Sequence, residues 1–489
     1  MDFFEQMEAR IPHGEVRTRF APSPTGYMHV GNLRTALYTW LIARRHHGKF
    51  ILRIEDTDQG RLVEGAVDVI YKTMAECGLD HDEGPDVGGP VGPYIQSERR
   101  ELFGKYAKLL CEKGGAYYCF CQKSDEDESE AAPGEIKKHV CACRDLPLEE
   151  AKKRVEAGEP FVIRQRIPHE GTTTFHDASF GDITVENKEL EDQVLLKSDG
   201  LPTYNFANVV DDHLMGITHV VRGSEYLSSA PKYNLLYEGF GWEVPTYVHC
   251  SPVMRDAQHK MSKRNGDPSY EDLKAQGYLT PAILNYVALL GWSPKNGQEI
   301  FSREEAVEMF DISAVTRKAA VLDMDKLNHI NQEQMKIMDP MKLLAVIRPF
   351  WVEMGFDLSG LSDEYLASSL HTMGGRGQTT KQLAEYSDYF VTFDVVKERY
   401  DASEIKDETR AVVRKFYNAL LTDCAEWKAD KMEEFTKEWI AANDSSMKVV
   451  CMPLRWALTG RKVSPGVFEV AEQLGRGECR RRLEYYNLV

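Results

Sequence analysis

The chain has 489 residues, enough for about three domains and for a large buried core. Hydrophobic residues make up 42% of the sequence and charged residues 28%, a balance typical of globular proteins and unlike that of disordered or fibrous chains. Its 60 lysines and arginines stand against 77 aspartates and glutamates, which gives a net charge of −17. This charge argues against a coat protein for nucleic acid or a basic lipid-binding surface, but it allows local basic patches.

No stretch approaches the roughly 18 consecutive apolar residues that a membrane span requires. The longest candidate, residues 281–292, contains Asn285 and predicts a buried helix. The N-terminal segment lacks the basic and apolar regions of a signal peptide. Six of the ten cysteines are scattered singly, which argues against a disulfide framework. We therefore expect a cytoplasmic protein that does not bind a membrane.

The first 115 residues alternate the patterns of strands and helices. A strand-like run at 16–21 ends in the loop sequence of residues 22–26, and apolar residues then recur at helical spacing from Leu33 to Arg44. A second strand-like run, 50–54, ends in the acidic residues 55–58. This order predicts a βαβ unit in a parallel sheet, with a right-handed crossover.

An insertion interrupts this alternation after residue 115. It holds a cysteine cluster, an acidic run at 124–130 and β-like pieces such as 161–167, and the α/β pattern returns at 201–204 and 219–222. From Tyr270 onward the chain reads almost wholly helical. The expected organisation is an α/β, Rossmann-type parallel-sheet domain in two halves, 1–115 and 201–255, an insertion at 116–200, a loop and helices at 256–330, and an all-helical C-terminal domain at 331–489.

The segment RFAPSPTGYMHVGN, residues 19–32, breaks a strand and opens a helix. Backbone N–H groups and the helix dipole meet at such a junction and favour phosphate. His29, directly before the helix, is placed to hydrogen-bond a phosphate oxygen, and Gly31 would let a nucleotide lie against the backbone where a Cβ would collide. A lone histidine is more often structural, so this motif alone does not establish a nucleotide site.

A second motif, Lys260-Met-Ser-Lys-Arg264, follows much later and is continued by Asn265 and Gly266. Three cations on a loop suit a mobile clamp for polyphosphate, although such a pentamer is by itself more often a solvated loop. The presence of both motifs in one chain, on a βαβ background, favours the phosphate-binding interpretation.

Two pairs of cysteines, Cys119-x-Cys121 and Cys141-x-Cys143, are separated by nineteen residues. In a cytosolic protein, this arrangement fits a closed tetrahedral Zn²⁺ site. Four unrelated buried thiols are the alternative, but the remaining cysteines scatter and these do not.

The two loop motifs resemble the HIGH and KMSKS signatures of class I aminoacyl-tRNA synthetases. Asn32 stands in place of the second histidine, a position that commonly varies in the family. Longer segments resemble bacterial glutamyl-tRNA synthetases, and the likeness runs from Arg17 to the C-terminus. These segments are FAPSPTGYMHVGN, RIEDTD at 53–58, LPTYNFANVVDDH at 201–213, THVVRGSEYL at 218–227 and MPLRWALTGR at 452–461.

The resemblance implies a monomer that uses ATP and Mg²⁺ to convert L-glutamate to glutamyl-adenylate, then transfers it to the 3′ end of tRNA(Glu). It implies catalytic roles for His29, Lys260 and Lys263. The implied ATP contacts are Pro22, Ser23, Pro24, His29, Gly31, Asn32, Glu225, Val253, Lys260, Met261, Ser262, Lys263 and Arg264. The implied glutamate contacts are Arg19, Ser23, Glu55, Tyr204, Asn208 and Arg222.

Glutamate needs a cation for its side-chain carboxylate and an anion or acceptor for its ammonium group. Arg19, at the end of the first strand, suits the carboxylate. Glu55, at the end of the neighbouring strand and on the same sheet edge, suits the ammonium group. Without the resemblance, Asn208 and Arg222 would be interpreted as a structural turn or ion pair.

The family's zinc ligands match Cys119, Cys121 and Cys143. The fourth ligand varies, so His139 and Asp145 compete with Cys141, and we favour Cys141 because thiolate is the softer ligand. The expected role is structural, in an insertion beside the acceptor end of tRNA.

The anticodon-reading region of the family matches Arg455, Ser464, Pro465 and Val467. Arg376 is a looser match, because glycines flank it. Surface arginines on a helical domain often serve solubility alone, whereas reading splayed bases requires stacking and arginine contacts.

Three rival functions can be compared with the sequence. Glutaminyl-tRNA synthetases typically end in β-barrels, whereas this tail reads helical. A shorter relative that modifies a tRNA nucleotide lacks the C-terminal half, and an RNA-binding paralogue without activity would have lost His29, Lys260 and Lys263. The sequence does not say whether tRNA(Gln) is charged as well, or whether activation requires tRNA.

Overall fold

The computed structural model describes residues 2–489 except 59, 61, 122–140, 260, 262–267, 402, 404 and 406. The chain divides into two compact units. The first comprises Met1–Asp272 and Leu284–Asp323, and the second comprises Leu273–Ile283 and Met324–Val489. Within the described residues, no helix combines the length and apolar character needed to cross a bilayer.

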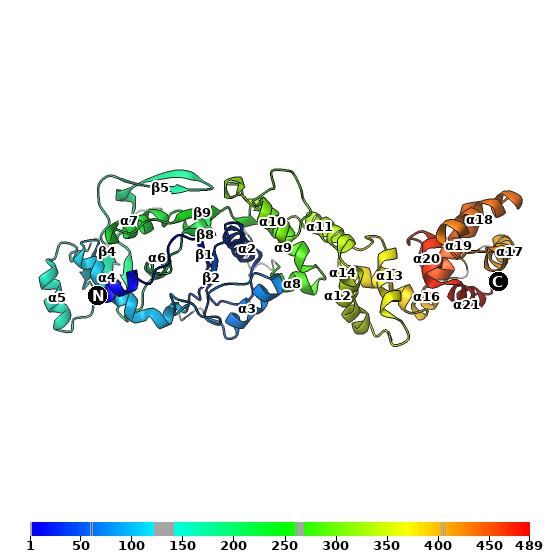
Figure 1. The fold of residues 1–489 in the computed structure, drawn as a ribbon, viewed down its shortest axis with the longest axis horizontal. Coiled ribbons are helices and arrows are strands. Elements are labelled where there is room, and N and C mark those ends of the chain that lie inside the picture. The colour runs from blue at the N-terminus through cyan, green and yellow to red at the C-terminus, as the bar shows by residue number, and fades with distance from the viewer. Residues whose placement is uncertain are drawn as a thin grey trace. The chain divides into compact units, whose positions relative to one another are not determined.

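A six-stranded sheet organises the first unit (Figure 1). Its strand order is β2-β1-β8-β9-β5-β6, in which the first five strands run parallel and β6 is antiparallel to β5. Helix α2 follows β1 and packs against β1, β2 and β8, which confirms the predicted βαβ unit. The bounds are β1 Arg17–Phe20, α2 Val30–Arg45, β2 Lys49–Leu52, β5 Thr172–Asp177, β6 Gly181–Glu186, β8 His219–Gly223 and β9 Thr246–Cys250.

The segment predicted as one insertion contributes to two sheets. β3 (Ala116–Cys119), β4 (Val162–Gln165) and β7 (Val194–Leu196) form a separate antiparallel sheet. β5 and β6 instead extend the main sheet, because Asp177 of β5 pairs in parallel with Tyr247 of β9. Exposed and buried residues alternate along β5, the pattern of a strand with one packed face and one face in water.

The other elements of the first unit surround these sheets. They are α1 Phe3–Glu8, α3 Ala66–Cys77, α4 Arg100–Glu112, α5 Leu148–Glu156, α6 Tyr204–Leu214, α7 Ala230–Phe240, β10 Val253–Met254, α10 Arg303–Met309 and β11 Ala320–Val321. Helix α8, Tyr270–Ala275, begins in the first unit and ends in the second. Helix α9, Thr280–Leu289, spans the boundary between the units and confirms the buried helix predicted there.

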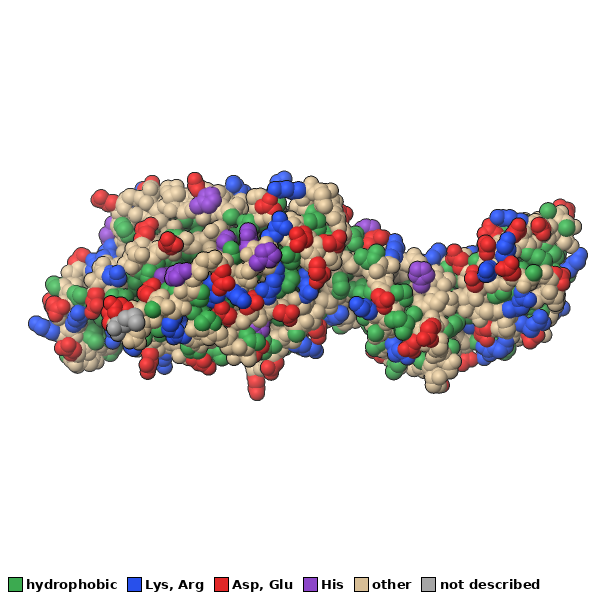
Figure 2. Space-filling model, viewed as in Figure 1, with side chains coloured by type: hydrophobic (Ala, Val, Ile, Leu, Met, Phe, Trp, Pro, Cys, Tyr) green, Lys and Arg blue, Asp and Glu red, His purple; other side chains and the backbone are tan. Residues whose placement is uncertain are grey.

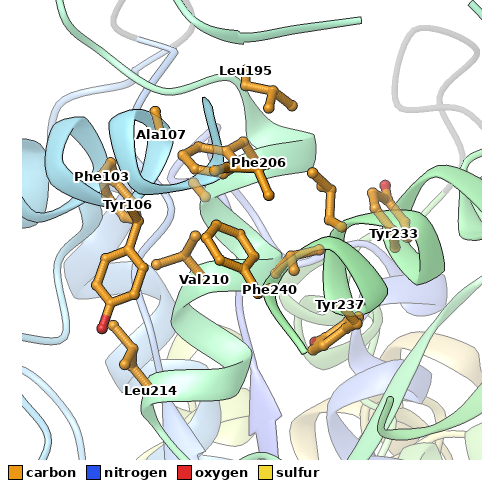
Figure 3. Close-up of a cluster of buried hydrophobic side chains, with 14 of the residues drawn as sticks. Phe103, Tyr106, Ala107, Leu195, Phe206, Val210, Leu214, Tyr233, Tyr237 and Phe240 are labelled. Carbon is orange, nitrogen blue, oxygen red and sulfur yellow. The ribbon is translucent and has the colours of Figure 1, made fainter. Parts of the chain in front are cut away.

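The core of the first unit is an aromatic cluster between helices (Figure 3). Phe206 of α6 and Phe240 of α7 lie with their rings 6.4 Å apart and nearly parallel. Tyr106 of α4 packs edge-on against Phe240 at 6.0 Å. Each large ring buries much apolar surface and stabilises the fold. The cluster therefore fixes α6, whose Asp212 contacts arginines of the site described below.

The second unit is helical, as predicted for the C-terminal part of the chain. Trp351 of α12 is fully buried and donates its indole N–H to the carbonyl of Ala384, 3.0 Å away. Tyr417 of α17 donates to the carbonyl of Val450 at 2.8 Å. The helices are α11 Met324–Ile337, α12 Pro340–Glu353, α13 Asp363–Thr372, α14 Thr380–Tyr386, α15 Asp388–Val391, α16 Asp394–Arg399, α17 Asp407–Asp423, α18 Ala429–Ala442, α19 Met447–Thr459, α20 Val467–Leu474 and α21 Arg476–Tyr485.

Candidate active site

A cavity of about 490 Å³ opens at the carboxyl ends of β1 and β8. These two strands are neighbours in the sheet, but β1 continues through α2 to β2 on one side, while β8 continues through α7 to β9 on the other. Such a topological switch point is where open α/β sheets bind ligands. The lining includes Arg19, Phe20, Pro22, Ser23, His29, Gly31, Asn32, Arg34, Glu55, Asp58, Tyr204, Arg222, Glu225, Tyr226, Ser251, Val253 and Met261.

His29 caps the N-terminus of α2 and faces this cavity. Its Nδ1 accepts a hydrogen bond from the backbone N–H of Gly31 at 3.1 Å. An accepting Nδ1 places the proton of a neutral imidazole on Nε2, where it can donate to an oxygen. A Cβ at position 31 would stand 3.3 Å from Nδ1, so the glycine also preserves the cap. The helix N-terminus and His29 together favour a phosphate group.

Two buried arginines share one carboxylate beside the cavity. Asp212 of α6 accepts from Arg19 Nε at 3.0 Å and from Arg53 Nη1 at 2.8 Å. Arg53 also donates to Glu55 at 2.8 Å. Burial alone would raise the pKa of Asp212, but Arg19 and Arg53 outweigh it and leave this pKa below its usual value. Burial raises the pKa of Glu55, although Arg53 opposes the shift.

Arg222 lies near the end of β8 and extends to the cavity between tyrosine rings. Its guanidinium carbon lies 4.4 Å from the ring centre of Tyr233 and 5.1 Å from that of Tyr247. Its Nε donates to His249 at 3.1 Å. Within the described residues, no carboxylate forms an ion pair with Arg222, and its buried Nη2 has no hydrogen-bond partner. Arg222 therefore offers a positive charge that the described chain does not neutralise.

Most of the sequence-predicted nucleotide and glutamate residues that the structure describes line this one cavity. Pro24 and Asn208 are absent from its lining. The Asn208 side chain is buried and donates to the carbonyl of Tyr204 at 2.7 Å, one helical turn back. Lys260, Ser262, Lys263 and Arg264 lie outside the described residues.

Several residues of the site were missed by sequence reasoning. Arg53 and Asp212 lie inside the motifs RIEDTD and LPTYNFANVVDDH, which do not show by themselves that the two side chains meet. Arg34 donates to the carbonyl of Leu290 at 2.7 Å and lines the cavity from α2. An arginine within a predicted apolar helix is the signal that could have identified Arg34, because charged residues are seldom buried without a partner.

The four clustered cysteines converge in the first unit. Their sulfur atoms all lie within 4.8 Å of one another, and the separation is 3.3 Å for Cys141–Cys119, 3.6 Å for Cys121–Cys141 and 3.9 Å for Cys121–Cys143. Four thiolates at about 2.3 Å from one zinc ion would stand about 3.8 Å apart in a tetrahedron, so this group could hold a metal ion. Asp145 is largely exposed and outside the group, and His139 lies outside the described residues.

The cysteines differ in acidity. A hydrogen bond from Cys141 lowers the pKa of the Cys119 thiol to about 4, and burial raises that of Cys121 to about 11. Zinc ligation would require all four sulfurs as thiolates, so binding of the metal would release the protons of the remaining thiols.

In the second unit, the structure brings together three of the residues predicted to read an anticodon. Arg455 of α19 donates to the hydroxyl of Ser464 at 3.0 Å, and Ser464 donates in turn to the carbonyl of Pro465 at 2.8 Å. Val467 begins α20 and is buried. Arg376 donates to the carbonyl of Met373 at 3.1 Å. On the face shown in Figure 2, basic and acidic side chains are mixed.

Comparisons with known proteins agree over most of the chain. Residues 15–329 match the family "tRNA synthetases class I (E and Q), catalytic domain", and residues 342–486 match an anticodon-binding domain family. The chain is 50% identical over 480 residues to glutamate–tRNA ligase from Clostridium botulinum, covering 96% of this chain and 97% of the relative. The chain belongs to the glutamate–tRNA ligase family of class I aminoacyl-tRNA synthetases.

Solved members of this family have the same fold. A crystal structure of a glutamate tRNA ligase from Elizabethkingia meningosepticum, in complex with its amino acid, aligns with a TM-score of 0.86 at 33% identity and covers 97% of this chain and 99% of that one. Glutamate-tRNA synthetase from Elizabethkingia anophelis aligns with a TM-score of 0.83 at 32% identity. The chain is thus an aminoacyl-tRNA ligase with an α/β catalytic part and a helical anticodon-binding part, as the sequence predicted.

Asp212→Asn is expected to make the free energy of unfolding fall less steeply as the pH is lowered. Because the folded pKa of Asp212 lies below its unfolded value, its charge stabilises the fold above the unfolded pKa of about 4, and this contribution is lost as the pH falls through the folded value. Urea unfolding between pH 6 and 2.5 would measure the effect. The variant should be less stable at pH 6 and show a shallower decline below about pH 4.

Glu101→Gln, which removes an exposed carboxylate of α4, is the matched control and should leave the acid decline unchanged. If the free energy of unfolding declined in parallel for wild type and Asp212→Asn, the two arginines would not lower the pKa of Asp212.

Proposed function

We propose that this chain ligates L-glutamate to tRNA(Glu), with ATP as the energy source. The glutamate α-carboxylate attacks the α-phosphate of ATP, pyrophosphate leaves, and the adenylate then passes its glutamyl group to the 3′ end of the tRNA. The observation that carries the proposal is the single cavity that joins the phosphate-binding start of α2 to two buried guanidinium groups. A triphosphate and an amino acid with an anionic side chain both find complementary charge there.

ATP would lie along the start of α2, with its phosphates against the helix N-terminus and His29 Nε2–H. Reaction at phosphorus requires little covalent participation by the protein, so positioning and charge stabilisation supply most of the catalysis. We propose that Lys260 and Lys263 contact the phosphates from the KMSKR loop. Mg²⁺ would bind mainly through the phosphates and neutralise their charge, and Asp58 and Glu225 are carboxylates of the cavity wall able to assist.

Glutamate would lie deeper, at the sheet edge. Arg19 and Arg222 are the cations proposed for its side-chain carboxylate, and Glu55, Tyr204 and Ser23 face the same space. Glu55 is already paired with Arg53, so its proposed contact with the ammonium group uses its remaining acceptor capacity. Asn208 would act indirectly, through its bond to the backbone of Tyr204.

Zn²⁺ is proposed as a structural ion held by Cys119, Cys121, Cys141 and Cys143. We further propose that tRNA(Glu) contacts the second unit near Arg376, Arg455, Ser464, Pro465 and Val467, and that the enzyme acts as a cytoplasmic monomer. The alternatives are an enzyme that also charges tRNA(Gln), and a glutaminyl-tRNA synthetase.

A charging assay tests the function directly. Purified protein with ATP, Mg²⁺ and either [¹⁴C]glutamate or [¹⁴C]glutamine would be offered tRNA(Glu) and tRNA(Gln) separately. The proposal expects glutamate on tRNA(Glu). Glutamate on both tRNAs would indicate the broader enzyme, and glutamine on tRNA(Gln) alone would overturn the proposal.

Lys263→Ala should lower kcat roughly 100-fold or more, with a smaller change in the KM for ATP. A cation aimed at phosphate oxygens acts most strongly where charge develops as pyrophosphate leaves. Steady-state charging with varied ATP separates the two constants. Lys72→Ala removes an exposed lysine of α3 and should change neither. A normal kcat with a raised KM would assign Lys263 to ground-state binding.

The purified protein should carry about one Zn²⁺ per chain, because two Cys-x-Cys pairs supply the four ligands of one site. Elemental analysis would measure the zinc content of Cys141→Ser and His139→Ala. We expect loss of zinc from Cys141→Ser, and retention in His139→Ala and in the control Cys451→Ser. Zinc-free wild type with ten titratable thiols would contradict the proposed site.

Arg19→Leu should lower the preference for glutamate over glutamine. Glutamine presents a neutral amide, whose NH₂ group would face a cation, and a mispaired buried site can reject an analogue by roughly 10⁴-fold. The measurement is the ratio of kcat/KM for the two amino acids. Arg19→Lys should also lose activity towards glutamate, because an ammonium group does not reproduce the planar fork. If Arg19→Leu is less active with an unchanged ratio, selectivity resides elsewhere.

A further inference from the structure

Three buried side chains from three parallel strands form a hydrogen-bonded series that ends at the cavity. Asp177 closes β5, His249 lies in β9, and Arg222 lies near the end of β8. Asp177 Oδ2 is 2.6 Å from His249 Nδ1, and His249 Nε2 is 3.1 Å from Arg222 Nε. Asp177 and His249 have no exposed surface, and only Arg222 lines the cavity.

The partners of Asp177 define its charge and, through it, the protonation of His249. Its carboxylate also accepts from the backbone N–H groups of Ser179, Phe180 and His249, at 2.9, 2.7 and 3.0 Å. Burial would raise the pKa of Asp177, but these donors and the imidazole lower it. An ionised Asp177 can only accept, so His249 Nδ1 must carry a proton and donate it.

His249 Nε2 must then accept from Arg222, because a guanidinium group can only donate. This requires a neutral imidazole. Burial, assisted by the charge of Arg222, lowers the pKa of His249 against the opposing effects of Asp177 and the nearby Glu225. The ring of Tyr247, 5.9 Å from the imidazole, is a further titratable neighbour. The series therefore has one internally consistent arrangement of protons.

We propose that His249 and Asp177 are positioning residues that hold Arg222 in the orientation in which it receives the side-chain carboxylate of the amino-acid substrate. This inference rests on the proposed function, in which Arg222 binds that carboxylate. The bond to His249 occupies Nε and leaves the terminal nitrogens for substrate. Of these, Nη2 is buried and has no partner among the described residues.

The chemistry of the partner matters as much as its position. A carboxylate in place of His249 would orient Arg222 equally well, but it would neutralise the charge that attracts the substrate. A neutral imidazole accepts the same hydrogen bond and leaves the guanidinium cationic. Asp177 then acts indirectly, because it fixes the tautomer of the His249 imidazole without contacting Arg222.

The competing interpretation is that the Asp177–His249 pair only ties β5 to β9. Two substitutions at position 249 separate these roles. His249→Gln can place a carbonyl oxygen near the position of Nε2 and keep an acceptor for Arg222. His249→Asn can place an amide nitrogen near the position of Nδ1 and keep a donor to Asp177, but it loses the acceptor.

The experiment measures charging of tRNA(Glu) by full-length variants at varied glutamate, then at varied ATP. His249→Asn should raise the KM for glutamate roughly 10-fold or more, because the charged donor loses its partner and its orientation. His249→Gln should stay within about three-fold of wild type. The KM for ATP should change little in either. His219→Gln, on the same strand as Arg222 but at its opposite end, is the control and should change neither constant.

Asp177→Asn supplies a second and independent comparison. An amide at position 177 can donate to Nδ1 and force the proton onto Nε2, where it meets the Nε–H of Arg222. The KM for glutamate should therefore rise roughly 10-fold in the wild-type background and hardly change in the His249→Gln background, since coupled residues are not additive. This comparison still decides the question if His249→Asn does not fold.

The inference would be overturned if His249→Asn and His249→Gln changed the KM for glutamate equally. It would also be overturned if Asp177→Asn raised this KM as much in the His249→Gln background as in the wild type. Either result would mean that the pair only connects the two strands. Arg222→Ala separates this failure from failure of the proposed function. If Arg222→Ala leaves the KM for glutamate unchanged, the assignment of Arg222 to glutamate is wrong. If Arg222→Ala raises it strongly while the His249 variants do not differ, only the positioning role is wrong.

Discussion

The shared carboxylate of Asp212 is the contact on which the catalytic unit depends. It joins Arg19 of β1 and Arg53, which follows β2, to helix α6, although the whole inserted segment separates these elements in sequence. Removing one partner of such a buried pair leaves an unpaired charge, which typically costs about 3–5 kcal/mol. The network therefore requires α6 to return to the carboxyl edge of the sheet. The aromatic cluster beneath it, with Phe206 and Phe240, holds the helix at that position.

The same network prepares the cavity for charged substrates. Arg19 is fixed by Asp212, and the start of α2 is fixed by the His29 cap, so neither has to reorganise when a ligand arrives. Preorganised dipoles and charges in a partly desolvated site contribute more to catalysis than mobile ones in water. The switch point between β1 and β8 brings these two sets of charges within one space of about 490 Å³.

Sequence reasoning predicted the local elements well and the long-range pairings poorly. The βαβ unit, the cysteine cluster and the helical tail each have a short-range signature in periodicity or spacing. By contrast, β5 joins β9 across about 70 residues, and no local pattern distinguishes it from the insertion that surrounds it. His249 and Asp177 were missed for the same reason, because the two side chains meet only through the pairing of β5 with β9. Arg53 and Asp212 lay inside recognised motifs, but only the fold shows that they meet.

The two guanidinium groups of the cavity differ in how their charge is balanced, and this difference has a consequence for specificity. Arg19 has an anionic partner in Asp212, whereas Arg222 has a neutral imidazole and three tyrosine rings. Cation–π contacts reduce the cost of burying Arg222 without neutralising it. An anionic side chain would restore the missing charge balance, and a neutral amide would not. Burying the Arg222 guanidinium without an anionic partner costs free energy, and only the correct substrate offsets this cost when it binds. Lower stability of the free enzyme in return for selectivity is a known property of functional sites.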